Sequence, residues 1–414
     1  MTAMPDHNII SMSDEAMMYS NPNWREALSS MEVPLAVSSS KIALDCLESL
    51  VSDGRLSFDQ GVELMKEKEI SSVTSLANMV KKSRFSKKVF FNENLHVNST
   101  NICVLACRFC AFRKGPRHPD AYTLNSDQYL DRIRPYSDSI DEVHTVGGLH
   151  PTWTVNEYCQ LFSSVKEEFP KIHIKALTAV EIKHLSTRSS LSIEETLSVL
   201  SKSGLDSLPG GGAEILVDSV RDRICMGKES SDEYLDIHGI AHSLGMPTNC
   251  TMLFGTIETI EDRITHLLRL REQQDLSGGF QCFVPYPFLP DKTRLPEAQL
   301  SSGLETIRMI SVSRLMLDNI PHIKAYRMNI GDKLASFAIN CGADDLDGTV
   351  GHEEIMHEAG SKTSLTTSSE QLARMIVTTG SVPVKRNSTY SKFEIINLPE
   401  GKPSKSLPVV ALEG

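Results

Sequence analysis

The segment NSTNICVLACRFCAFRKG (residues 98–115) contains three cysteines, Cys103, Cys107 and Cys110, in a C-x3-C-x2-C pattern. Thiolates are soft ligands that suit iron–sulfur clusters. Three thiolates satisfy three irons of a cubane and leave the fourth iron open, as catalytic zinc sites keep a vacant position. Two alternatives remain open, a zinc site with His118 as an additional ligand and three buried free thiols. The spacing is not that of a usual zinc module, so it favours a [4Fe–4S] cluster.

This segment follows the first of a series of β-rich runs that alternate with helical patterns. Such alternation predicts βαβ units and a parallel sheet. The candidate strands occupy residues 89–98, 141–148, 173–181, 204–211, 247–255, 279–288, 322–329 and 343–348. Eight strands close a (β/α)8 barrel. The predicted fold class is therefore α/β, a TIM-type barrel of residues 88–350 with an N-terminal helical extension.

The segments on either side of the barrel have other patterns. Residues 1–40 are rich in Ser, Met and Asn and are predicted to be a poorly ordered extension. Residues 41–87 have helical periodicity, with Ser57 as an N-cap candidate, and are predicted to form a helical entry segment. Residues 351–414 are predicted to be a C-terminal helical segment and tail that packs on the barrel.

Composition limits the class of protein. The 414 residues are 40% hydrophobic and 23% charged, which fits a soluble globular chain. The net charge of −11, without a basic block, argues against binding to nucleic acid or to an anionic membrane. No apolar run reaches the roughly 20 residues that span a bilayer, and the N-terminus does not resemble a signal peptide. The nine cysteines favour free thiols in a reducing compartment, so we expect a cytoplasmic protein without membrane insertion.

The loops after the predicted strands contain candidate site residues, because TIM barrels build their active sites from these loops. Gly147 and Gly148 follow the second strand and let a ligand approach the backbone. Glu181 ends the third strand, where it suits ribose hydroxyls or a protonated amine, or simply caps the next helix. Gly211 is the centre of a glycine triplet that admits a ligand or forms a flexible loop.

Four further residues are candidates for ligand binding. Asn249 and Met252, on the fifth strand, are predicted to contact an adenine, or else to fill the barrel. Phe109 is predicted to pack on the adenine, or else to shield the cluster from water. Arg221 is able to pair bidentately with a carboxylate, although an exposed helical arginine is the ordinary alternative.

The cysteine motif, with Phe109 before its last cysteine, resembles the radical S-adenosylmethionine superfamily. The resemblance implies that the amino and carboxylate groups of S-adenosylmethionine chelate the open iron. It also implies that an electron from the cluster cleaves the sulfonium to methionine and a 5′-deoxyadenosyl radical. Gly147 and Gly148 match the segment that contacts the amino group. The implied electron donor is a reductant protein such as flavodoxin or ferredoxin.

Further runs, among them EVHTVGGLHP, HIKALTAVEI, GLDSLPGGGAEI and TNCTMLFGTIET, are similar to the aminofutalosine synthases of menaquinone biosynthesis. That family implies radical addition to 3-[(1-carboxyvinyl)oxy]benzoate, giving 6-amino-6-deoxyfutalosine, methionine and bicarbonate. The candidate catalytic residues are His150 and Arg327, and together with Arg221 they are the candidates for binding the carboxylates of this anionic substrate. The alternatives are the sister enzyme dehypoxanthine futalosine cyclase, another hydrogen-abstracting relative, or a non-catalytic zinc or iron–sulfur protein.

Overall fold

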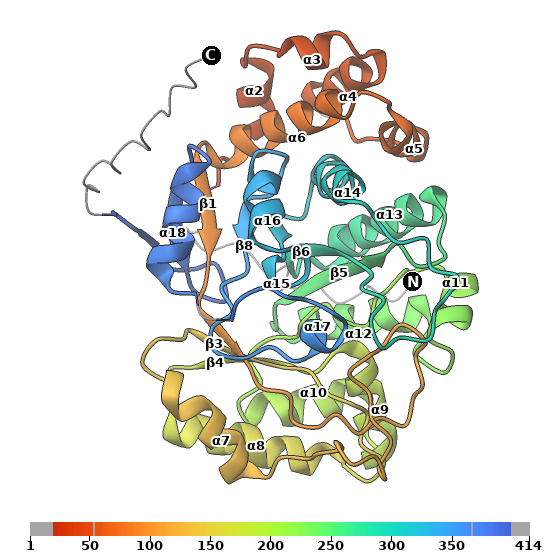
Figure 1. Cartoon of the computed structure of the whole chain (residues 1–414), viewed down its shortest axis with the longest axis vertical. Coiled ribbons are helices and arrows are strands. Elements are labelled where there is room, and N and C mark those ends of the chain that lie inside the picture. Colours follow the sequence, from red (N-terminus) through yellow and green to blue (C-terminus); the bar gives the residue numbers. More distant parts are fainter. Residues whose placement is uncertain (1–19, 53, 366, 399–414) are drawn as a thin grey trace, which may run out of the picture.

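The computed structural model describes residues 20–52, 54–365 and 367–398. A ring of strands forms the centre of the molecule, and helices surround it (Figure 1). The strands are β1 (Lys88–Phe91), β2 (Asn94–His96), β3 (Glu142–Thr145), β4 (His173–Ala176), β5 (Thr248–Phe254), β6 (Phe280–Pro287), β7 (His322–Ala325), β8 (Asp345–Leu346), β9 (Val382–Arg386) and β10 (Phe393–Ile395). One large cluster of buried apolar side chains packs the strands against the helices.

The ring closes through all eight strand positions that the sequence predicts. β2, β3 and β4 pair in parallel, and so do β5, β6, β7, β8 and β1. Single parallel bridges, from Ser207 to Lys175 and from Leu208 to Thr248, join the two groups. The chain continues directly from β1 into β2, which completes the circle. The predicted TIM-type α/β fold is therefore confirmed.

Two of the predicted strands differ from a regular ladder. Residues 204–211 pair only through the two bridges, and at Gly210 a Cβ atom would lie 2.5 Å from the Cα of Cys250 on β5. This close approach requires a glycine, so the segment packs on β5 by its backbone. The first predicted strand is divided into β1 and β2, because β1 pairs with β9 on the side where β2 pairs with β3.

Helices cover the outside of the ring (Figure 1). They are α7 (Ser126–Ile133), the 3-10 helix η1 (Arg134–Tyr136), α8 (Val155–Glu168), α9 (Ala179–Ser189), α10 (Ile193–Lys202), α11 (Asp218–Ile224), α12 (Ser231–Ser243), α13 (Ile260–Ser277), α14 (Gly303–Met316), α15 (Arg327–Ile330) and α16 (Asp332–Ile339). Capping boxes begin α7, α8, α9, α10, α12 and α13. These boxes satisfy backbone donors of the first turn and so fix where each helix starts.

The N-terminal segment is more ordered than the sequence predicts. It contains α2 (Trp24–Ser29), α3 (Leu35–Ser38), α4 (Lys41–Val51), α5 (Phe58–Lys66) and α6 (Ile70–Phe85). A capping box at Ser57 and Gln60 begins α5, as expected from Ser57. Residues 20–40 correct the prediction of a poorly ordered extension, because Leu28 of α2 and Val37 of α3 are buried in the main core. The remainder of that prediction falls outside the described residues.

The C-terminal segment also differs from a purely helical prediction. It contains α17 (Ile355–Glu358) and α18 (Ser369–Thr378), but it also adds β9, parallel to β1, and β10, antiparallel to β9. Arg386 of β9 forms two bonds to the buried carboxylate of Asp345, of 2.6 and 2.9 Å, and Tyr390 donates to the same group. The ring of Tyr390 stacks on His322 at 4.0 Å. Arg386 and Tyr390 therefore pack at the amino-terminal ends of β7 and β8.

Candidate active site

A cavity of about 290 Å³ lies within the barrel and opens toward the carboxyl ends of its strands. Each strand from β2 to β7 contributes side chains to the lining, and so do the cysteine segment and the glycine triplet. The lining combines apolar walls, including Leu105, Phe112 and Leu253, with a small set of buried charges. Enclosed apolar space with few polar groups is typical of a small-molecule site.

The three cysteines predicted as ligands all line this cavity. Bonds to neighbouring segments fix their loop, since the Nη2 atom of Arg294 donates to the carbonyl of Ala106 at 2.7 Å and Arg108 N donates to Ile224 O at 2.8 Å. Burial raises the pKa of the Cys107 thiol to about 12 and raises that of Cys110. Bare thiolates are thus unfavourable here, and cationic iron would offset that cost.

The donor set fits a [4Fe–4S] cluster, because three soft ligands on one wall leave an open iron toward the cavity. His118, the candidate fourth ligand for zinc, is exposed and lies beside Asp120 instead. Within residues 20–52, 54–365 and 367–398, no group of three His, Cys, Asp or Glu side chains is arranged to hold a single metal ion.

The glycine pair after β3 and Glu181 form one unit. Gly147 lines the cavity and donates its N–H to Glu181 Oε1 at 2.9 Å. The other carboxylate oxygen accepts from the N–H and hydroxyl of Thr178, at 2.8 and 2.7 Å, as the capping box of α9. Burial nevertheless raises the pKa of Glu181 to about 7. Gly148 packs behind, where a Cβ would lie 2.2 Å from the carbonyl oxygen of Ile102, so only glycine fits against the cysteine segment.

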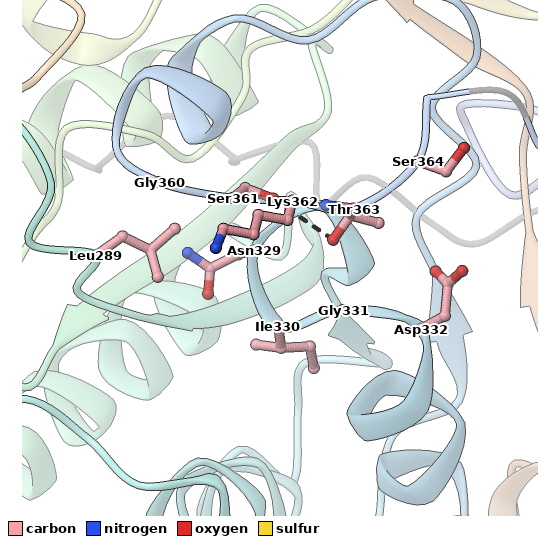
Figure 2. Close-up of a pocket in the computed structure, with 10 residues that line it drawn as sticks. All are labelled: Leu289, Asn329, Ile330, Gly331, Asp332, Gly360, Ser361, Lys362, Thr363 and Ser364. Atoms are coloured by element: carbon pink, nitrogen blue, oxygen red, sulfur yellow. Dashed lines mark hydrogen bonds between the residues drawn. The ribbon is translucent and has the colours of Figure 1, made fainter.

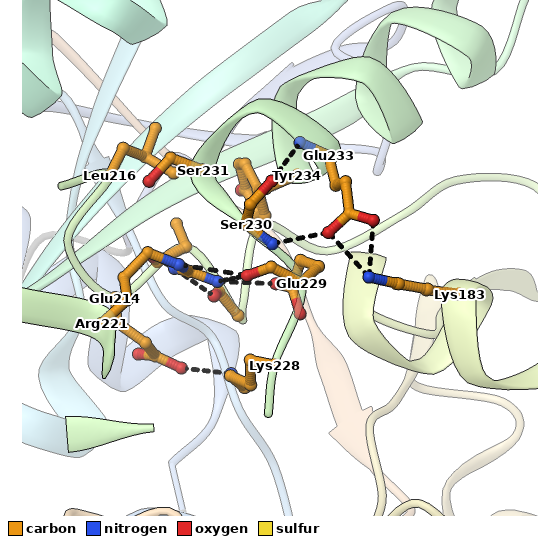
Figure 3. Close-up of polar contacts among 12 residues, drawn as sticks. Lys183, Glu214, Leu216, Arg221, Lys228, Glu229, Ser230, Ser231, Glu233 and Tyr234 are labelled. Carbon is orange, nitrogen blue, oxygen red and sulfur yellow. Dashed lines mark hydrogen bonds and ion pairs between the residues drawn. The ribbon is translucent and has the colours of Figure 1, made fainter. Parts of the chain in front are cut away.

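The glycine triplet lines the cavity, but Arg221 does not. Its Nη1 donates to the carbonyls of Gly212 and Ala213, and Nη2 donates to Glu229 (Figure 3). These bonds occupy the guanidinium of Arg221, which is 3% exposed, and they fix the glycine triplet in place. The prediction that Arg221 binds a ligand carboxylate is therefore corrected to a structural role.

Beside the triplet, Lys228 faces the cavity and forms a 2.6 Å ion pair with Glu214 (Figure 3). Its Nζ atom lies 5.7 Å from the ring centroid of Phe109, which also lines the cavity. This places a positive charge next to the cysteine segment.

The fifth strand contributes only one of its two predicted residues. Asn249, Thr251 and Leu253 line the cavity, whereas Met252 is fully buried on the other face of β5. Side chains alternate across a strand, so Asn249 and Met252 cannot both point inward. The structure therefore places Met252 among the buried side chains outside the cavity lining, and its predicted contact with adenine stays a prediction.

The two predicted catalytic residues also lie outside the cavity lining. His150 accepts a hydrogen bond from the N–H of Thr152, and its ring centroid lies 5.1 Å from that of Trp153. Arg327 binds Asp332 and Thr367, both at 2.8 Å. Asp332 lines a separate pocket of about 460 Å³ between α15 and residues 360–364 (Figure 2). The catalytic roles of His150 and Arg327 therefore stay predictions, and the structure places both side chains outside the cavity lining.

Three lysines in the cavity were missed by the sequence analysis: Lys175 on β4, Lys324 on β7 and Lys228. The signal that would have found two of them is a lysine inside an otherwise apolar strand. The same tetrapeptide, HIKA, forms both β4 and β7. His96 and His144 also line the cavity, with their rings stacked at 4.5 Å.

Comparisons with known proteins agree with this site. Residues 97–270 match the model of the radical SAM superfamily, and residues 277–399 match that of the CofH/MqnC C-terminal region. Methylornithine synthase (PylB) has the same fold, with a TM-score of 0.65 and 18% identity, covering 81% of this chain and 96% of its own. Fold and cysteines together define a radical SAM enzyme.

Two relatives narrow the family. Aminodeoxyfutalosine synthase of Thermus thermophilus is 38% identical over 84% of this chain and 95% of its own length. The 5-amino-6-(D-ribitylamino)uracil–L-tyrosine 4-hydroxyphenyl transferase of Methanoculleus marisnigri is 34% identical over 84% and 96%. The chain belongs to the radical SAM family that includes the aminodeoxyfutalosine synthases. No described helix is long and apolar enough to cross a membrane.

Proposed function

We propose that this radical SAM enzyme transfers the 5′-deoxyadenosyl group of S-adenosylmethionine to the enol-ether double bond of 3-[(1-carboxyvinyl)oxy]benzoate. Water is consumed, and the products are 6-amino-6-deoxyfutalosine, methionine, bicarbonate and a proton, as on the futalosine route to menaquinone. The observation that carries the proposal is that the three cysteines and the Gly147–Glu181 unit line one enclosed cavity. The 38% identity to an aminodeoxyfutalosine synthase supports this particular reaction.

We assign the protein ligands of the [4Fe–4S] cluster to Cys103, Cys107 and Cys110. When bound, the cluster supplies the electron that cleaves the sulfonium of S-adenosylmethionine. Two hydrogen bonds hold the cysteine segment in place: Arg294 donates to the carbonyl of Ala106, and Ile224 accepts from the N–H of Arg108. Such fixed geometry limits the reorganisation that binding requires.

The adjoining residues suit S-adenosylmethionine. Gly147 and Gly211 leave the backbone open to the ligand, and Glu181 fixes the Gly147 loop through its N–H. Phe109 offers a ring for the adenine to pack against. Lys228 provides a cation for the methionine carboxylate beside the cysteines.

The rest of the cavity protects the reaction. Leu105, Phe112, Leu253 and Phe288 are apolar and line its walls. Apolar walls exclude water and polar hydrogen-atom donors, such as thiols, that would quench a radical before it adds to the substrate.

The test is an anaerobic assay of the reconstituted protein with reductant, S-adenosylmethionine and 3-[(1-carboxyvinyl)oxy]benzoate. We expect an adenosyl-containing adduct with one methionine per adduct, identified by mass spectrometry. Formation of 5′-deoxyadenosine with an oxidised substrate would instead identify a hydrogen-abstracting relative, such as the sister cyclase. Flavodoxin and ferredoxin are the proposed physiological reductants, to be compared with dithionite in the same assay.

A further inference from the structure

Two identical strands place two lysines in the cavity from opposite sides. β4 and β7 both read HIKA, and they are the third and seventh of the eight strand positions around the ring. In a closed ring of eight, positions four apart face each other. Lys175 and Lys324 therefore extend into the cavity from opposing walls, where they are 4% and 8% exposed.

A carboxylate on a neighbouring strand holds each lysine. Lys175 Nζ lies 2.7 Å from Glu142 Oε2 on β3, and Lys324 Nζ lies 3.2 Å from Asp345 Oδ1 on β8. Arg386 already binds Asp345 through two bonds, so Lys324 shares its partner with a second cation. Lys324 thus has capacity to bind a further anion.

The environment between the two lysines favours an anion. Burial lowers the pKa of Lys175. The positive charge of Lys324 lowers this pKa further, whereas the negative charge of Glu142 raises it. Two like charges facing each other in a desolvated space repel, and an anion between them removes the repulsion.

The lysines lie deeper in the barrel than the proposed cluster. Lys175 is in register with His144 on β3, three residues before Gly147. At about 3.3 Å per residue, this places Lys175 roughly 10 Å below the glycine loop. The reacting double bond must lie near the cluster end, so the opposite end of the substrate extends toward the lysines.

We propose that Lys175 and Lys324 together bind the ring carboxylate of the substrate, and thereby select benzoates over phenyl ethers that lack a ring carboxylate. This inference rests on the proposed function. The ring carboxylate is the substrate group farthest from the reacting carbon, so binding it at depth positions the double bond without contact to the reaction centre. The lysines are positioning residues in this scheme.

The test compares Lys175→Met and Lys324→Met with wild type on two substrates. One is 3-[(1-carboxyvinyl)oxy]benzoate, and the other is 2-phenoxyacrylate, which lacks the ring carboxylate. Loss of a charged hydrogen bond is expected to raise KM for the benzoate by about 10- to 100-fold in each variant. The KM for 2-phenoxyacrylate should stay within about twofold, because this substrate has no ring carboxylate for the lysines to bind.

Lys183→Met is the matched control, since Lys183 is an exposed lysine of α9 paired with Glu233 outside the cavity. It should leave both KM values unchanged. Equal effects of the cavity variants on both substrates, or no effect on the benzoate, would overturn the proposal.

Removing Lys175 leaves Glu142 buried and unpaired, which threatens folding. The double variant Lys175→Met with Glu142→Gln removes both charges and keeps the test valid. A second readout is equilibrium dialysis of 3-ethoxybenzoate, which lacks the reactive double bond, with the reconstituted enzyme. Binding in wild type and its loss in the lysine variants would support the carboxylate site even if no adduct forms. The dialysis therefore separates failure of the proposed function from failure of the lysine site. Binding that the lysine variants leave unchanged would refute the lysine site.

Discussion

Cys107 is the most buried of the three proposed cluster ligands, 7% exposed at the cavity wall. We expect Cys107→Ser to lose most of the bound iron and sulfide and all adduct formation, because the cluster would have only two thiolates. Iron and sulfide analysis with electron paramagnetic resonance of the reduced protein measures this. Cys159→Ser, on α8 outside the cavity, should retain the wild-type signal. A full cluster content in Cys107→Ser would refute the ligand assignment.

Glu181 should make stability depend on pH near neutrality. Burial raises its pKa in the folded protein to about 7 from the ordinary value of 4.5, so the folded protein binds more protons than the unfolded chain in this window. Stability from this group is complete below about pH 4.5 and is lost as pH rises through 7, by about 3 kcal/mol at most. Thermal unfolding across this range should therefore show a flatter profile for Glu181→Gln than for wild type.

Glu195 is a matched control for Glu181, because it occupies the same capping-box position on α10 but is exposed. Hydrogen bonds from Ser192 lower its pKa, so its contribution is present above the unfolded pKa and is lost as pH falls. Glu195→Gln should leave the slope between pH 4.5 and 7 as in wild type. Identical profiles for wild type and Glu181→Gln would contradict the assignment.

The sequence predicts a site residue correctly when local sequence determines where its side chain points. The spacing of Cys103, Cys107 and Cys110 is local, so the cavity-facing wall they share was predictable. His150, Arg221 and Arg327 are predicted from residue type alone, whereas their hydrogen bonds go to Thr152, Glu229 and Thr367. Residue type does not specify which of these partners a side chain takes.

Among the elements, β9 has the clearest energetic consequence. Arg386 and Asp345 form a buried pair, and both side chains are at most 2% exposed. Arg386→Met would leave the carboxylate buried with only Lys324 and the Tyr390 hydroxyl as partners, so we expect a loss of about 3–5 kcal/mol in the free energy of unfolding. Urea denaturation measures the change.

The comparison for this prediction is Arg374→Met on α18, whose i,i+4 pair with Glu370 is more than half exposed. Exposed helical pairs contribute about 0.3–0.5 kcal/mol, so this variant should be nearly neutral. Equal losses in the two variants would show that β9 contributes no more than a surface contact.

Element prediction succeeded where the hydrophobic pattern was strong. β5 and β6 are long and largely buried, and the sequence placed both to within two residues. Residues 204–211 form only two bridges, because packing on β5 through Gly210 replaces the ladder. β9 was missed because its partner, β1, lies far away in the sequence, and such pairing leaves no local signal.

At the scale of the whole molecule, the two matched family regions form one folding unit. The boundary between residues 270 and 277 falls inside α13, and β6, β7 and β8 of the second region complete the ring begun by the first. We expect a fragment of residues 1–276 to lack a cooperative urea transition, because β5 and β1 would each lose partners.

The full chain should unfold in a single transition. Its two tryptophans, Trp24 on α2 and Trp153 before α8, lie in different parts of the molecule (Figure 1). Their fluorescence should change together with far-UV circular dichroism. Separate transitions in the full chain, or a cooperative transition in the fragment, would show that the regions fold independently.

The pairing of β1 with β8 also sets an order of events during synthesis. The ribosome releases the cysteine segment early, but β8, which closes the ring against β1, begins at Asp345, about 250 residues after the end of β1. At about 5–20 residues per second, the nascent barrel stays open for roughly 13 to 50 s. During that interval the thiols are accessible to assembly factors, and to oxygen. We therefore expect cluster insertion during or soon after translation to be easier than insertion into the finished protein.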